Sequence, residues 1–177
     1  MLVTLNGVRQ LLVVSATRIM GVVPGDGKLL WEYPFATFNG INAAQPLVIG
    51  DNRVFVSASY GAGSAMIELS GGGDRFAVRE VWRNTRMKNR FSGSVLQDGV
   101  IYGLDEGILA AIDAETGELK WKGGRYGYGQ VLLAGSNPGE TMPPLMQYFA
   151  AQKANGGKVV VADPRPSTTA QTGTLHV

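Results

Sequence analysis

The sequence predicts a mainly β fold, in which a partial β-propeller of about three blades precedes a short β-α-β (Rossmann-like) segment. Two observations predict the propeller: a strand-only pattern that recurs about every 40–50 residues, and three tryptophans in similar sequence surroundings. A third observation predicts the final segment, because a helical pattern lies between two apolar runs near the C-terminus. We divide the chain into residues 1–133 and residues 134–177.

The tryptophans Trp31, Trp82 and Trp121 mark the three copies of the repeat. GDGKLLWEY and ETGELKWKG each place a glycine-containing turn before a short strand with Trp, and FAVREVWRN is a looser copy. Upstream, NGVRQLLVVS, IGDNRVFVSAS and QDGVIYGLD each follow a polar turn with β-branched or aromatic residues. Three or four short strands per repeat are typical of a propeller blade. We therefore expect the tryptophans to pack between blades rather than to bind a ligand.

The stretch AIDAETGELKW, residues 111–121, resembles the repeat of the pyrroloquinoline-quinone-like (PQQ-like) β-propellers, and the resemblance covers about residues 1–133. Quinoprotein dehydrogenases with this repeat use an adjacent Cys pair under the quinone and a calcium ion beside it. This sequence has no Cys, and it has no acidic cluster with calcium-ligand spacing. The resemblance therefore implies a bacterial scaffold or peptide-binding platform rather than a quinoprotein enzyme.

Three blades do not close a circle, because propellers typically have four to eight. Open strand edges invite pairing with another chain. We expect a protein or peptide partner, further blades of the same propeller, or self-association through open blade edges. Asn42, Tyr60 and Arg90 fall in loops between strands. They either line a face of the propeller or are solvated loop residues.

Composition excludes several function classes. A net charge of +2 is too small to indicate a nucleic-acid partner or an anionic membrane surface. No apolar run reaches the roughly 18–20 residues of a membrane span. The absence of Cys and the presence of one His, His176, exclude thiolate metal sites, a Cys nucleophile and a multi-His metal site. LLVVSA is too short for a signal-peptide core, so we expect no targeting segment, and the compartment stays unknown.

The C-terminal part has the pattern of a right-handed β-α-β unit. QVLLAG (130–135) and KVVVADP (158–164) are apolar strands, and LMQYFAAQKA (145–154) has an apolar helical face. Thr141 suits the helix cap. Ligands of such units bind at the loops that follow the strands. Those loops begin at Gly135 and at Asp163.

GSNPGETMPP and the later run ADPRPSTTA resemble the molybdopterin oxidoreductases of the assimilatory nitrate reductase type. In that family these loops hold a molybdopterin guanine dinucleotide. The resemblance implies that the cofactor-contacting residues here are Gly135, Ser136, Asn137, Asp163, Arg165 and Thr169.

This second resemblance has departures. Ser167 stands where Thr is usual, and Gly173-Thr174 stands where Ala-Asp is usual. No Cys is present for an iron–sulfur cluster, so we expect no catalytic residue. The alternative is that Asp163 and Arg165 form only a turn and a surface ion pair, and that the chain binds no cofactor.

The function that the sequence predicts is a non-catalytic propeller scaffold or binding module. The alternative is a fragment of a molybdopterin-guanine-dinucleotide-dependent oxidoreductase such as nitrate reductase. The two resemblances meet at the run VLLAG. Three explanations fit this junction: a recombined or wrongly joined open reading frame, a natural fusion fragment, or a repeat protein whose tail only mimics the motif.

Overall fold

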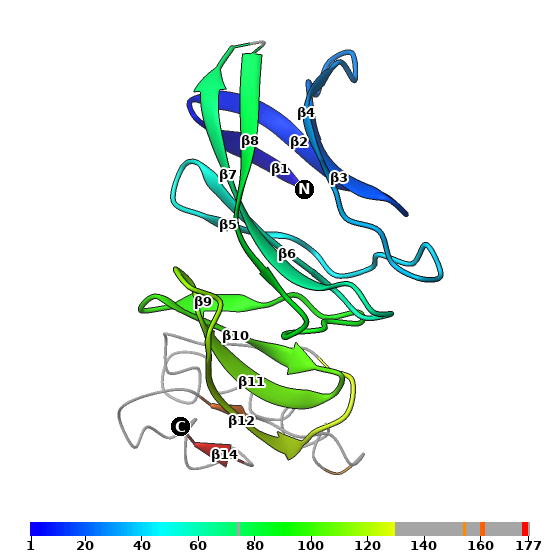
Figure 1. Cartoon of the computed structure of the whole chain (residues 1–177), viewed down its shortest axis with the longest axis vertical. Coiled ribbons are helices and arrows are strands. Elements are labelled where there is room, and N and C mark those ends of the chain that lie inside the picture. Colours follow the sequence, from blue (N-terminus) through cyan, green and yellow to red (C-terminus); the bar gives the residue numbers. More distant parts are fainter. Residues whose placement is uncertain (74, 130–153, 155–159, 162–174, 177) are drawn as a thin grey trace. The chain divides into compact units, whose positions relative to one another are not determined.

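A computed structural model describes residues 1–73, 75–129, 154, 160–161 and 175–176. The chain forms two compact units, Met1–Gln130 and Val131–Val177. The first unit holds three antiparallel four-stranded sheets, each with its strands in chain order (Figure 1).

Each of the three sheets corresponds to one blade of the predicted propeller. Blade 1 consists of β1 (Leu2–Leu5), β2 (Val8–Val14), β3 (Arg18–Val22) and β4 (Leu29–Pro34). Blade 2 consists of β5 (Leu47–Ile49), β6 (Arg53–Ala58), β7 (Gly63–Gly72) and β8 (Arg75–Asn84). Blade 3 consists of β9 (Val95–Gln97), β10 (Val100–Asp105), β11 (Ile108–Asp113) and β12 (Leu119–Arg125).

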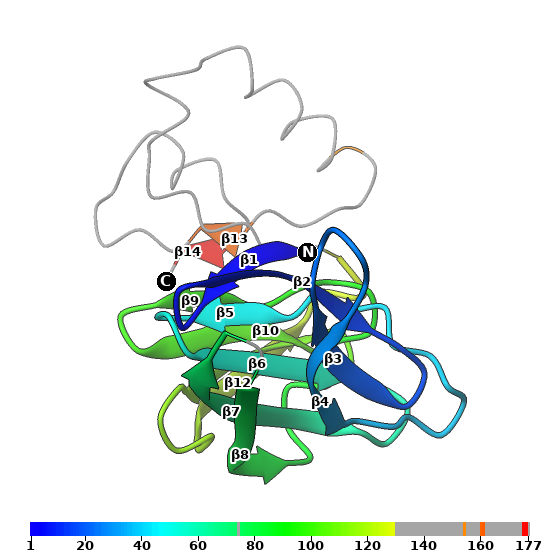
Figure 2. The ribbon, with the colours of Figure 1, turned by 90° about the horizontal axis from the view of Figure 1, so that it is seen from above.

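Blade 2 lies between blades 1 and 3 (Figure 1), and in the view from above the three sheets overlap, with blade 1 nearest the viewer (Figure 2). Successive side chains of a strand point to opposite faces of its sheet. On β6, Val54 and Val56 accordingly join a core cluster with blade 1, whereas Phe55 joins a second cluster with blade 3. All three side chains are buried. The continuous apolar run of β6 therefore follows from burial on both faces, and the mainly β, partial-propeller expectation is confirmed.

The boundary between blades 1 and 2 is built around Trp31. Its side chain is 4% exposed, and its indole Nε1 donates to Gln10 Oε1 over 2.6 Å. A Cβ at Gly21 would lie only 2.3 Å from each of these two atoms, so only glycine fits beneath them. Nearby, the Tyr33 hydroxyl donates to the Glu80 carboxylate of blade 2. Burial and this hydrogen bond raise the pKa of Tyr33 to about 12.

The boundary between blades 2 and 3 is built around Trp82. Its Nε1 donates to the carbonyl oxygen of Ala114 over 3.0 Å. Its ring covers Gly117, where a Cβ would lie 2.7 Å from the ring carbons. Asn84 Nδ2 donates to the Gly117 carbonyl oxygen over 2.8 Å. The expected packing of Trp between blades is therefore confirmed for Trp31 and Trp82.

Trp121 has a different environment. Its ring lies 6.1 Å from the ring of Tyr102 in the same blade, centroid to centroid. The matching pair in blade 2 is Phe55 and Trp82, 6.0 Å apart. Within the described part of the chain, the indole N–H of Trp121 donates no hydrogen bond and no further blade covers it. The expectation that each Trp packs between blades is thus met at two of the three positions.

In the second unit, β13 (Val160–Val161) pairs in parallel with β14 (Leu175–His176). Strand β13 falls inside the run 158–164 that the sequence predicts to be a strand. The predicted strand at 130–135 and nearly all of the predicted helix lie outside the described residues, and so does the β-α-β arrangement itself.

Among the described residues, no helix has the length and the apolar character that are needed to cross a membrane.

Candidate functional site

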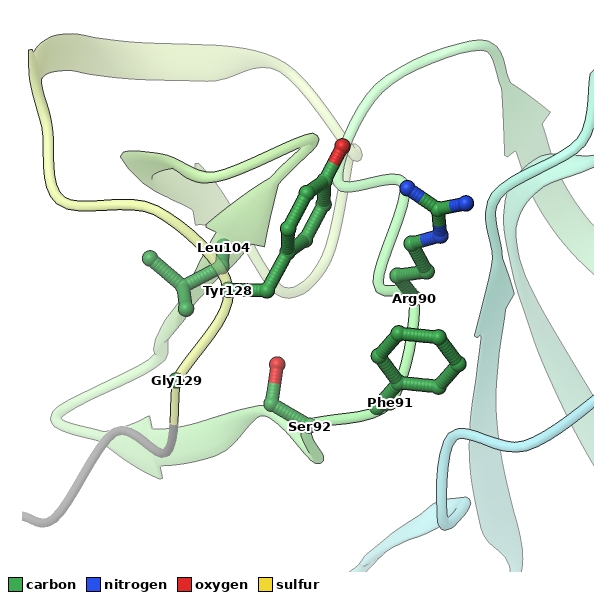
Figure 3. Close-up of a pocket in the computed structure, with 6 residues that line it drawn as sticks. All are labelled: Arg90, Phe91, Ser92, Leu104, Tyr128 and Gly129. Carbon is green, nitrogen blue, oxygen red and sulfur yellow. The ribbon is translucent and has the colours of Figure 1, made fainter.

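Three aromatic side chains surround the guanidinium group of Arg90, and Figure 3 shows two of them, Phe91 and Tyr128. Tyr60 lies in the β6–β7 turn, Arg90 and Phe91 lie in the β8–β9 connection, and Tyr128 follows β12. The Arg90 Cζ atom lies 5.3, 5.4 and 4.8 Å from the ring centroids of Tyr60, Phe91 and Tyr128, respectively. Each contact is within the range of a cation–π interaction. We call these four residues the arginine–aromatic cluster.

Hydrogen bonds fix the cluster. Arg90 Nε donates to the Tyr60 hydroxyl oxygen over 3.1 Å. This bond, and a second to the Tyr128 hydroxyl, raise the pKa of Arg90, so its positive charge persists at any working pH. Glu106 Oε1 accepts from Ser59 Oγ over 2.9 Å, and Glu106 Oε2 accepts from the Tyr128 hydroxyl over 3.4 Å. The rings are therefore held at both hydroxyl ends while their faces stay partly free.

The cluster exposes apolar area to solvent. Phe91 is 57% exposed and Tyr128 is 54% exposed. Phe38 is 91% exposed, and its backbone N–H donates to the carbonyl oxygen of Tyr60 over 3.0 Å. A pocket of about 190 Å³ opens at the cluster, and its walls are Arg90, Phe91, Ser92, Leu104, Tyr128 and Gly129 (Figure 3). Small-molecule sites usually measure about 300–1,000 Å³. This pocket is of a size for one side chain rather than for a dinucleotide.

The backbone at the cluster departs from ordinary turn chemistry. Tight hairpin turns with two positive φ angles favour Asn-Gly or Asp-Gly, and Asn6-Gly7 and Asp98-Gly99 obey this rule. Tyr60-Gly61 and Glu106-Gly107 adopt the same φ signs, with φ of 56° at Tyr60 and 52° at Glu106. A left-handed conformation costs an L-residue roughly 1–2 kcal/mol. Both exceptions adjoin the cluster, and strained backbone of this kind gathers at functional sites.

The structure brings together two of the three loop residues that the sequence analysis singled out. Tyr60 and Arg90 are in direct contact. Asn42 instead fastens the β4–β5 connection, since its Nδ2 donates to the carbonyl oxygens of Ser15 and Phe35 over 2.6 and 3.2 Å. Sequence reasoning missed Phe91, Tyr128 and Glu106. The available signals were the aromatic neighbour of Arg90 in NRFSG and the aromatic–glycine alternation of GRYGYG.

The cofactor-contacting residues expected from the second resemblance lie outside the described residues: Gly135, Ser136, Asn137, Asp163, Arg165 and Thr169. In the part of the chain that the structure does describe, no group of three or more His, Asp or Glu side chains is placed to hold a metal ion.

Comparison with protein families gives a match over the propeller unit. A family model described as outer membrane protein assembly factor BamB matches residues 2–123, more than two thirds of the sequence. The chain belongs to this family of PQQ-like repeat proteins. The crystal structure of BamB from Moraxella catarrhalis superposes with a TM-score of 0.52 and 17% sequence identity. The superposition covers 71% of this chain and 40% of that chain, and it shows a shared propeller fold.

Curated relatives include proteins of a second kind. An assimilatory nitrate reductase catalytic subunit of Bacillus subtilis is 38% identical over 47 residues, which are 27% of this chain and 7% of that protein. An uncharacterized oxidoreductase of Mycobacterium bovis is 28% identical over 82 residues, which are 46% of this chain and 9% of that protein. The similarity is thus partial and distant, and the chain spans less than a tenth of these relatives.

Proposed function

We propose that the propeller unit is a non-catalytic binding module that holds a protein or peptide segment against the arginine–aromatic cluster. The observation that carries this proposal is the partly exposed guanidinium of Arg90, surrounded by three aromatic rings beside a pocket for one side chain. Residues 1–133 supply the module, and residues 134–177 form a separate domain.

The composition of the cluster suits a protein interface. Tyr, Phe and Arg are enriched at the centres of such interfaces, and Tyr and Arg also at their energetic hot spots. The aromatic rings bury large areas at a small cost in side-chain entropy, because each has few rotatable bonds. A guanidinium carries five N–H donors, of which the hydroxyls of Tyr60 and Tyr128 occupy only a part. The partner segment inserts an apolar or aromatic side chain into the pocket and presents a carboxylate or backbone carbonyl to Arg90.

The fold and the family support the same class of function. The family description names an assembly factor, which is a protein that acts on other proteins. A propeller presents several loops on one face, so that side chains distant in sequence form one surface. Tyr60, Arg90 and Tyr128 lie in three different connections: the β6–β7 turn, the β8–β9 connection and the segment after β12.

The test uses random twelve-residue peptides displayed on phage and selected against the full chain. Selected peptides are synthesised and their dissociation constants are measured by calorimetry. We expect binding to fall at least ten-fold, about 1.4 kcal/mol, in Arg90→Ala and in Phe91→Ala. Arg86→Ala is the matched control, because it removes an equal charge from an exposed position of the same connection.

The Arg86→Ala variant is expected to bind like the unmodified chain. Selected peptides that bind Arg90→Ala and Phe91→Ala with unchanged affinity would contradict the proposal, as would a selection that enriches no peptide.

A second candidate is a fragment of a molybdopterin-guanine-dinucleotide-dependent oxidoreductase such as nitrate reductase. The partial similarity to the curated oxidoreductases favours it. Under this proposal the loops at 135–137 and 163–169 hold the guanine half of the cofactor. Guanosine diphosphate is then expected to bind the full chain and to bind more weakly to Asp163→Ala and Arg165→Ala. A flat titration with the unmodified chain would rule this candidate out.

A further inference from the structure

The pocket at the arginine–aromatic cluster has a polar group at its floor. Ser92 is only 3% exposed and Leu104 only 6%, whereas Phe91 and Tyr128 are more than half exposed, so the first two form the deepest part of the pocket. The Ser92 hydroxyl points into the space between Phe91 and Tyr128 (Figure 3). It has no hydrogen-bond partner among the described residues. Leaving a nearly buried hydroxyl without a partner costs free energy, so this one is placed to bond a polar atom of a ligand.

The walls above this floor are aromatic. The ring centroids of Phe91 and Tyr128 lie 6.4 Å apart, and the ring planes form an angle of 67°. Aromatic pairs favour such edge-to-face arrangements at about 4.5–7 Å, and a third ring that enters the pocket can extend the same packing. A side chain that matches both walls and floor therefore has a flat apolar ring with a polar group at its far end. Tyrosine has this form, whereas phenylalanine has no group for the Ser92 hydroxyl.

The rim of the pocket carries a positive charge that no described carboxylate pairs with. Arg90 is half-buried, and its described partners are the hydroxyls of Tyr60 and Tyr128 and three aromatic rings. Other described cations do pair with carboxylates, among them Arg18, Arg53, Arg79, Lys88, Lys120 and Lys122. The described arginines that lack such a pair, apart from Arg90, are exposed to solvent: Arg9, Arg75, Arg83, Arg86 and Arg125. Arg90 thus combines partial burial with an unpaired charge.

The acidic side chains near the cluster are engaged elsewhere. Both carboxylate oxygens of Glu106 accept from hydroxyls, those of Ser59 and Tyr128. Asp105 is paired with two lysines. A guanidinium binds a carboxylate well because two of its N–H groups can donate in parallel to the two oxygens. Charge complementarity therefore favours a partner that brings its own carboxylate to Arg90.

We propose that the segment held at the arginine–aromatic cluster is acidic and contains a tyrosine. The tyrosine ring enters the pocket between Phe91 and Tyr128, and its hydroxyl hydrogen-bonds to Ser92 Oγ. An aspartate or glutamate close to this tyrosine in the partner sequence pairs with Arg90 at the rim. The proposal rests on the proposed function and names the chemistry of its partner. Ser92 then selects tyrosine over phenylalanine, because a site that bonds a hydroxyl discriminates against the analogue that lacks it.

The test uses matched forms of the peptides that are selected on the full chain. Each peptide is synthesised as selected, with its tyrosine replaced by phenylalanine, and with its acidic residue replaced by the corresponding amide. Calorimetry with the unmodified chain is expected to show binding about five-fold weaker for the phenylalanine form and about ten-fold weaker for the amide form, because the second change removes a charged hydrogen bond.

Two variants of the chain assign these preferences to their residues. Ser92→Ala removes a hydroxyl that has no described hydrogen bond, so the fold is retained, and it is expected to bind the tyrosine and phenylalanine forms equally. Ser94→Ala is the matched control, because the Ser94 hydroxyl donates to Asn89 Oδ1 over 3.0 Å and does not line the pocket. This control is expected to keep the preference for tyrosine. Arg90→Gln is expected to bind the acidic and amide forms equally.

Selected peptides that need Phe91 for binding but share no tyrosine would overturn this proposal and leave the proposed function intact. A preference for tyrosine that survives Ser92→Ala would overturn it as well, and so would a preference for the acidic form that survives Arg90→Gln. Peptides with unchanged affinity for Arg90→Ala and Phe91→Ala contradict the proposed function itself, so the two failures are distinguishable.

Discussion

The two blade boundaries of the propeller unit use the same tryptophan position in different ways. Trp31 bonds to Gln10 within its own blade, whereas Trp82 bonds to Ala114 of the next blade and covers Gly117. The receiving blade causes the difference. Blade 2 extends β7 and β8 to ten residues each, whereas the short turn at 113–118 places its glycine directly under the incoming ring. Docking is therefore a property of the turn that receives the Trp rather than of the Trp itself.

The largest expected effect comes from adding one methyl group to each of two turn glycines with the same φ of 73°, Gly117 in the turn at 113–118 and Gly27 in the turn at 23–28. Gly117→Ala strains a left-handed backbone and drives a Cβ into the ring of Trp82, so we expect it to cost about 2–4 kcal/mol. Gly27→Ala brings only the backbone strain, roughly 1–2 kcal/mol, because no described atom lies within 4 Å of a Cβ at Gly27. Urea denaturation gives both free energies of unfolding.

The difference between these two values measures how tightly Trp82 packs against the turn of blade 3. Equal costs for Gly117→Ala and Gly27→Ala would show that the ring yields without cost, and the distinction between a docked and an open turn would then be lost.

A smaller effect is expected from a buried carboxylate near the boundary between blades 2 and 3. Asp105 of blade 3 accepts from Lys122 Nζ over 2.6 Å and from the backbone N–H of Lys88 over 3.1 Å. Lys88 belongs to the connection that leads from blade 2 to blade 3, so this buried carboxylate holds the connection in place. Burial opposes ionisation of Asp105. The hydrogen bonds and the two ammonium charges outweigh burial, however, and hold the pKa of Asp105 below its usual value.

A lowered pKa in the folded state means that the stabilising contribution of Asp105 is complete above the unfolded value of about pH 3.9. It is lost as the pH falls through the folded pKa. We expect Asp105→Asn to lose about 1.5–3 kcal/mol near pH 6 and to show a flatter decline in acid. Urea denaturation between pH 6 and pH 3 measures both effects. The control is Asp51→Asn, an exposed position, and an identical acid profile for both variants would contradict the assigned role of Asp105.

The blades could be predicted from the sequence because each repeat combines strand patterning with a turn dipeptide such as Asp98-Gly99. These signals are local. The alternation at Val54, Phe55 and Val56 also follows from local sequence, although only the structure shows which face meets which blade.

The arginine–aromatic cluster could be predicted only in part. Tyr60 and Arg90 were recognised as loop residues, but their contact depends on how blades 2 and 3 pack, over a separation of 30 residues. The sequence preferences of tight turns also did not predict these two turns, because Tyr60 and Glu106 occupy left-handed positions that usually favour Asn or Asp. A site that breaks local rules is hard to read from local patterns.

The chain has three tryptophans, one at the same position of each blade. Their indoles differ in surroundings: one is almost fully buried, one rests on a neighbouring glycine turn, and one packs beside Tyr102 of its own blade. Indole fluorescence depends on shielding from water, so each ring reports on a different part of the propeller unit. In variants that keep a single tryptophan, the fluorescence of that indole would therefore report local unfolding around one blade without an added label.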